Sequence, residues 1–237
     1  MGEEEIKLKK IKDHKFMVLL VIDFGMTKFG GITKEGAINY VSKIYGKLSQ
    51  IKRLLETLQM IRIMIAQMHP IVFTNNQSVI SKPAQLRYHI ENYFLRITTY
   101  KDLVHQLLIL VLQLNIKKTN NLAQLIRKQV ETSNDNIILQ LVSDLETLFT
   151  EVKKIRNKLA HEATLSDVDI DIMETAYFLN KETPEIFDSE EFEIYSSMLI
   201  LRNTQEMMKI EEDLATNLLV VADNLYDRYK NILERFN

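Results

Sequence analysis

The sequence predicts an all-α protein built of long helices, with one short β segment near its N-terminus. The 237 residues include only three prolines and six glycines, which is few for an all-β fold with many turns. Most of the chain repeats apolar residues every three or four positions, the period of a helix that buries one face. The exception is the run from Phe16 to Ile22, which is rich in residues that favour strands.

The N-terminal segment is expected to form one or two short strands. The β-rich run ends at Asp23, and Gly25, Gly30 and Gly31 follow it in a stretch typical of turns. We therefore divide the chain into an N-terminal strand and turn segment, residues 1–35, and a helical domain, residues 36–237.

Two long helices are expected next. The first runs from about Gly36 to Met68, where His69 and Pro70 end it, because the residue before a proline disfavours helical backbone. The second opens with Pro83, which suits the first turn of a helix, and ends near Asn115. Its buried face is marked by Leu86, Ile90, Phe94, Ile97, Val104, Leu108 and Val111.

The second half of the chain predicts further helices. A short one spans about residues 120–131, and a turn over 132–135 then supplies the N-cap of the next helix. That helix carries an apolar stripe as far as Leu159: Ile138, Leu141, Val142, Leu145, Leu148, Phe149, Val152, Ile155 and Leu159. A short helix over 167–181 follows. From Pro184 to Phe236 we expect one very long helix, or two with a bend.

Composition limits the classes of function. The net charge of −2 argues against a general electrostatic coat for nucleic acid, so any such contact needs a local basic patch. The absence of cysteine excludes disulfides, cysteine zinc sites and thiol nucleophiles, and fits the cytoplasmic location that we expect. No apolar run approaches the about 20 residues of a membrane span, so we expect no membrane partner. No histidine pair has metal-ligand spacing, and we expect no metal or cofactor.

The candidate catalytic residues are Arg156, Asn157 and His161, at the end of the helix that carries the long apolar stripe. Asn157 and His161 are four residues apart and so lie on one face, away from the stripe. An arginine can grip a phosphate through its planar fork, and a histidine can move a proton near neutral pH. Together these groups could cut RNA without a metal ion.

Further polar residues support this candidate site. Lys153, Lys154 and Lys158 surround the motif, and residues 151–162 hold four cations against two carboxylates, a patch that could bind an RNA backbone. The helix from Pro83 carries a polar row, His89, Asn92, Arg96, Thr99, Asp102 and Gln106. Within this row, Arg96 and Asp102 could orient the His161 imidazole or add a cation.

A helical bundle with the sequence Arg-Asn-Lys-Leu-Ala-His late in a helix resembles the HEPN superfamily. That family's motif is an arginine, about four to six residues and a histidine, often with asparagine directly after the arginine. Arg156, Asn157 and His161 fit it with four intervening residues. The stretch from Glu91 to Asp102 is similar to the other core helix of prokaryotic members. The resemblance covers about residues 80–237 and implies a HEPN-like helical bundle.

The resemblance also implies a function. HEPN ribonucleases usually dimerise, so that two motifs share one composite cleft, and they cleave RNA without metal by attack of the ribose 2′-OH. It implies His161 as general base or acid, Arg156 as the group that stabilises phosphate charge, and Asn157 as a positioning or phosphate-binding residue. Similar proteins serve in toxin–antitoxin or antiviral defence. The expected partners are RNA, a second copy and a cognate antitoxin or regulator.

Other interpretations remain open at this stage. Arg156 and His161 also suit a solvated helix end, where the helix dipole favours cations. A second arginine–histidine pair, Arg62 and His69, has six intervening residues but lies before Pro70 and lacks a polar residue after the arginine. His105 is expected at the edge of the core. The rival functions are a non-catalytic module that binds RNA, nucleotide or a protein, and a coiled assembly built on the C-terminal helix.

Overall fold

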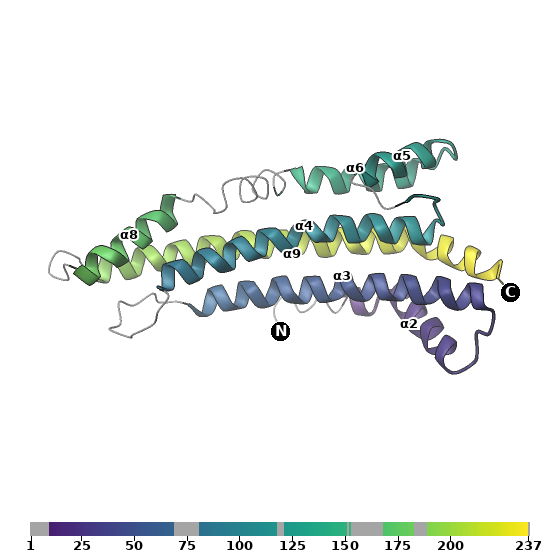
Figure 1. The fold of residues 1–237 in the computed structure, drawn as a ribbon, viewed down its shortest axis with the longest axis horizontal. Helices are drawn as coiled ribbons and strands as arrows, with labels where there is room; N and C mark the ends of the chain where they lie inside the picture. The colour runs from purple at the N-terminus through teal and green to yellow at the C-terminus, as the bar shows by residue number, and fades with distance from the viewer. Residues whose placement is uncertain are drawn as a thin grey trace. The chain divides into compact units, whose positions relative to one another are not determined.

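The computed structural model describes residues 10–68, 81–117, 121–150, 152, 168–182 and 189–236. Every regular element in these ranges is a helix (Figure 1). The prediction of an all-α protein with long helices is therefore confirmed, and the predicted N-terminal β segment is wrong. Within the same ranges, no helix has both the length and the apolar character needed to cross a membrane.

The chain forms two compact units. Unit 1 comprises Met1–Leu55, Thr98–Thr150 and Glu212–Asn237, and unit 2 comprises Glu56–Ile97 and Glu151–Glu211. In unit 1 the core lies among α2, α5, α6 and parts of α3, α4 and α9. In unit 2 it lies among α8 and the remaining parts of α3, α4 and α9. The predicted boundary near residue 35 stays a prediction.

Helix α2 (Lys15–Lys28) replaces the predicted strands. His14 caps it, because its Nδ1 accepts a hydrogen bond from the Phe16 backbone N–H. The buried residues are Phe16, Leu20 and Asp23, at spacings of four and three, so one helical face packs on the core. This face contacts Tyr229 on α9, and the Tyr229 hydroxyl donates a hydrogen bond to Asp23 Oδ2 at 2.7 Å. Packing on one face thus overrides the β propensity of the run.

Helices α3 (Glu35–Gln67) and α4 (Lys82–Val111) match the predicted pair within a few residues. Six of the seven expected apolar positions of α4 are buried: Leu86, Ile90, Ile97, Val104, Leu108 and Val111. Phe94 is only half-buried, and Tyr93 and Tyr100 occupy the core beside the other six. Each tyrosine hydroxyl donates to a carbonyl of α9 within its own unit, Tyr93 to Met207 and Tyr100 to Leu214.

Helices α5 (Leu122–Glu131) and α6 (Asn136–Leu148) pack against each other in unit 1. The turn between them is the predicted one. Asn134 adopts a φ of 52°, a left-handed conformation that asparagine tolerates, and Asp135 caps α6 by accepting from the Ile138 backbone N–H. The N-terminal part of the predicted stripe is buried on α6: Ile138, Leu141, Val142 and Leu145.

Helix α6 ends at Leu148 with Phe149 as its C-cap, and helical backbone returns at residues 150 and 152. The remainder of the predicted helix, up to residue 161, therefore stays a prediction. Two threonines lie beside this interruption. Thr147 and Thr150 donate their hydroxyls to backbone carbonyls four residues earlier, those of Ser143 and Glu146. Such bonds compete with the helix ladder and bend helices. Residues 153–167 lie outside the described residues.

Helices α8 (Val168–Glu182) and α9 (Ser189–Glu234) complete the fold. The predicted short helix over 167–181 is confirmed. Of the two expectations for the C-terminal stretch, one very long helix is correct, because α9 runs for 46 residues.

Candidate functional site

The catalytic triplet predicted from the sequence, Arg156, Asn157 and His161, lies outside the described residues. The same holds for the three lysines of the basic patch, Lys153, Lys154 and Lys158. Their roles therefore remain predictions. The structure does describe the two supporting residues, Arg96 and Asp102. It also describes α6, which precedes the motif in the chain, and α8, which follows it.

The supporting residues Arg96 and Asp102 are both exposed on α4. Arg96 Nε donates to Asn92 Oδ1 at 2.8 Å, one helical turn earlier. The two supporting residues are six positions apart, which is about 240° around a helix, so they do not share a face. Arg96 belongs to unit 2 and Asp102 to unit 1. The structure does not bring them together, and their contact with His161 stays a prediction.

The polar row to which they belong is not uniform. At its N-terminal end, His89 Nδ1 is buried and has no hydrogen-bond partner among the described residues, and burial lowers the pKa of this imidazole. At the other end, Gln106 Oε1 accepts a hydrogen bond from Lys47 Nζ on α3 at 2.7 Å. The row therefore mixes solvated residues with residues that pack, because it drifts around α4 over several turns.

A buried histidine faces α6 in unit 1. His105 on α4 is 2% exposed, and its Nε2 lies 3.8 Å from Glu146 Oε1. Neither atom has a hydrogen-bond partner among the described residues, while Lys101 Nζ lies 3.3 Å from the same Glu146 oxygen. Burial lowers the pKa of His105 to about 4, although the Glu146 carboxylate acts to raise it.

This environment decides what His105 can do. With a pKa of about 4, its imidazole is neutral at pH 7, so it is not in the imidazolium form that a general acid of this type needs. The expected place of His105 at the edge of the core is corrected: at 2% exposure, it lies inside the core. Glu146 could not be predicted as its neighbour, since the two residues lie on different helices.

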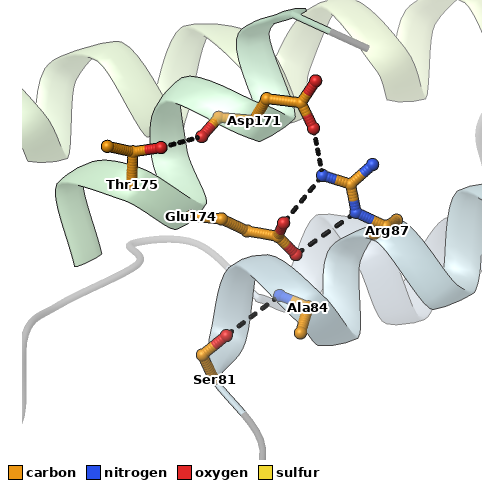
Figure 2. Close-up of polar contacts among 6 residues, drawn as sticks. All are labelled: Ser81, Ala84, Arg87, Asp171, Glu174 and Thr175. Carbon is orange, nitrogen blue, oxygen red and sulfur yellow. Dashed lines mark hydrogen bonds and ion pairs between the residues drawn. The ribbon is translucent and has the colours of Figure 1, made fainter. Parts of the chain in front are cut away.

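In unit 2, an arginine joins α4 to the helix that follows the motif in the chain. Arg87 donates to both carboxylate oxygens of Glu174, through Nε at 3.2 Å and through Nη2 at 2.8 Å (Figure 2). Its Nη2 also donates a hydrogen bond to the Asp171 carboxylate. Figure 2 also shows Ser81 accepting from the Ala84 backbone N–H at the start of α4. A fork that binds two carboxylates fixes the rotation of α8 against α4.

A second contact holds the start of α8 to α9 in the same unit. Asp169 accepts from the Tyr195 hydroxyl at 2.7 Å and lies 2.7 Å from Arg202 Nη2. These two hydrogen bonds hold the pKa of the Asp169 carboxyl below its ordinary value. Sequence reasoning missed this anchor and that of Arg87. The acidic spacing Asp169, Asp171 and Glu174 was the available signal, but their basic partners lie far away in the chain.

The second arginine–histidine pair is explained by a structural role of its arginine. Arg62 is buried on α3 and its Nε lies 3.1 Å from Glu211 Oε2 on α9, within unit 2. The Glu211 carboxylate is half-buried, and its ion pair with Arg62 gives this arginine a structural role in unit 2.

Comparison with known proteins does not identify the chain. No protein-family model, no curated protein and no solved structure matches it. In the part of the chain that the structure describes, no group of three or more histidine, cysteine, aspartate or glutamate residues could hold a metal ion.

Proposed function

We propose that this protein is a metal-independent endoribonuclease of HEPN type, active as a homodimer in the cytoplasm. The observation that carries the proposal is the sequence motif: Arg156 is followed directly by Asn157 and, after four intervening residues, by His161. The all-helical fold with long helices supports it, since a HEPN domain is a helical bundle.

The chemistry follows from the three residue types. His161 takes the proton of a ribose 2′-OH, and the 2′-oxygen attacks the adjacent phosphorus. The bond from phosphorus to the 5′-oxygen breaks, and that oxygen takes a proton from the second imidazole of a dimer or from water. Arg156 stabilises the charge that builds on the phosphate oxygens, and Asn157 positions the imidazole or a phosphate oxygen. The products are a 2′,3′-cyclic phosphate and a 5′-hydroxyl, so the activity is confined to RNA.

The wider setting is part of the same proposal. A twofold dimer places two copies of the motif in one cleft, and Lys153, Lys154 and Lys158 bind the RNA backbone beside it. Arg96 and Asp102 support the site from the other core helix. A nuclease of this kind acts in toxin–antitoxin or antiviral defence, where a cognate antitoxin or regulator restrains it.

Two substitutions test the roles of the motif. We expect His161→Ala to abolish cleavage, and Arg156→Lys to lower its rate by at least about tenfold, because lysine keeps the charge but loses the bidentate fork. The matched control is Arg235→Lys, an exposed arginine near the C-terminus. Full cleavage by Arg156→Lys, with unchanged thermal unfolding, would remove Arg156 from the mechanism.

A second candidate is a non-catalytic module that binds a protein partner. The observation that favours it is an apolar row on α9 in unit 2: Ile194, Met198 and Leu201 are each more than half exposed, at spacings of four and three. Exposed apolar rows of this kind are typical of interaction surfaces. The same His161→Ala variant separates the two candidates, because it would leave partner binding through this row unchanged.

A further inference from the structure

Helix α2 turns an apolar face outward. Val18, Ile22 and Phe29 are spaced by four and seven residues, so they fall on one line along the helix, and Val21 and Met26 flank that line. All five are exposed, and Phe29, just beyond the helix end, is 91% exposed. The opposite face, with Phe16, Leu20 and Asp23, is the one that packs on the core.

A helix that is apolar on all sides is normally buried. In α2 the core covers only one side, and the outward stripe is contiguous rather than scattered. Exposed apolar stripes of this kind are typical of surfaces that bind another protein or a membrane. Something outside the described residues of the chain is therefore needed to cover Val18, Val21, Ile22, Met26 and Phe29.

The charges around the stripe indicate what that is. Residues 10–35 contain five exposed lysines, at positions 10, 12, 15, 28 and 34, against two exposed carboxylates, Asp13 and Glu35. The other carboxylate of this stretch, Asp23, is buried against Tyr229. Lys15 and Lys28 stand at the two ends of the stripe, although Lys15 also lies 3.5 Å from Asp223 on α9. An apolar face between cations matches a surface that is apolar inside and anionic at its rim.

We propose that α2 lies in the plane of an anionic lipid bilayer and inserts its outward stripe at the boundary between headgroups and acyl chains. Its 14 residues are fewer than the about 20 of a span, so it rests on the membrane rather than crossing it. Phe29 and Ile22 enter the apolar layer, while Lys15 and Lys28 reach the lipid phosphates. This proposal departs from the expectation of no membrane partner, which rested on the length of apolar runs.

A second copy of the chain fits this face less well. A stripe of five side chains on one short helix is well below the about 800 Å² per partner that stable protein interfaces bury. A twofold contact through it would also place lysines near lysines, whether the two helices run parallel or antiparallel, with no exposed carboxylate on α2 to offset them. Membrane insertion has no such area requirement, because its strength grows with each buried apolar group.

Vesicle flotation with the purified full chain tests the proposal. The probes are vesicles of phosphatidylcholine alone and vesicles of phosphatidylcholine with phosphatidylserine. We expect binding to the anionic vesicles only, weakened by salt. Phe29→Ser and Ile22→Ser should each lower the partition coefficient by about tenfold or more, the factor that corresponds to one large apolar side chain left in water. Lys28→Glu should weaken binding to the anionic vesicles.

Matched controls are Met60→Ser on α3, an apolar residue of similar exposure, and Lys209→Glu on α9. Neither should change flotation. Binding to neither kind of vesicle, or equal loss with Met60→Ser, would overturn the proposal. So would a dimer in sedimentation equilibrium that Phe29→Ser dissociates, because the stripe would then be covered by a second copy. The test does not depend on RNA cleavage.

Discussion

His105 couples the stability of unit 1 to pH. Its folded-state pKa of about 4 lies below the ordinary value of 6.5, so the unfolded chain takes up the proton first. The neutral His105 imidazole therefore favours the folded state fully above about pH 6.5. This contribution to the free energy of unfolding is lost as the pH falls towards 4. At about 1.4 kcal/mol per pKa unit, wild type should lose about 2 kcal/mol from this residue between pH 7 and pH 5.

The variant His105→Gln removes the titrating group from this buried position. We expect its free energy of unfolding to fall less than that of wild type between pH 7 and pH 5, whatever its stability at pH 7. Urea unfolding at the two pH values measures the difference. An equal fall in both proteins would show that His105 does not carry the coupling.

Single residues also show where sequence reasoning fails. The pattern on α4 predicted Phe94 as a core residue, but the core holds Tyr93, which continues the spacing of four and three set by Leu86 and Ile90. The Tyr93 hydroxyl donates to the Met207 carbonyl on α9. A buried tyrosine needs such a partner, and that partner is 114 positions away in the chain. Arg87 was missed for the same reason, since Asp171 and Glu174 lie on another helix.

At the scale of elements, the positions of the long helices could be predicted because their apolar residues repeat with the helical period over many turns. Helix α2 could not, because Phe16 to Ile22 is apolar without a break and shows no period. A strand would have needed a second strand to pair with, and the sequence predicts none outside this segment. The interruption at Phe149 was missed because Phe149 is itself a buried member of the apolar stripe, so the period shows no break there.

The capping residue of α6 gives a test at this scale. Asp135 accepts from the Ile138 backbone N–H and also from Arg228 Nη2 on α9, at 2.7 Å. We expect Asp135→Ala to cost about 1–2 kcal/mol, mainly through the lost cap. Each kcal/mol lowers Tm by about 2–4 °C in a chain of this size, which thermal unfolding by circular dichroism would detect.

The control for the cap is Asp144→Ala on the same helix. Asp144 is exposed and accepts only from Gln140 one turn earlier among the contacts described, so its loss should change stability by less than about 0.5 kcal/mol. If both variants lowered Tm equally, the cap of α6 would have no special role.

For the whole molecule, near-neutral net charge makes RNA binding depend on a local patch. Each phosphate neutralised on a single strand contributes about 0.7 to the slope of log affinity against log salt. Replacing Lys153, Lys154 and Lys158 with glutamine should therefore reduce that slope by about 2. Fluorescence anisotropy with a labelled RNA across a salt series measures it. An unchanged slope would place the RNA-binding surface elsewhere.

Sequence reasoning reached the candidate site only in part. The chemistry of Arg156, Asn157 and His161 could be read from residue types and spacing, since both are local. The contacts that hold α8 through Arg87 and Asp169 join residues distant in the chain, and no periodicity reveals them. Whether the motif faces a second copy depends on a surface that one sequence does not encode locally.

The most direct test of the central claim is incubation of the purified wild-type protein with mixed single-stranded RNA in excess EDTA, beside His161→Ala. We predict cleavage by wild type alone, with 2′,3′-cyclic phosphate ends on the products. An absence of cleavage by a folded wild-type dimer, or equal cleavage by the variant, would contradict a metal-free ribonuclease centred on His161.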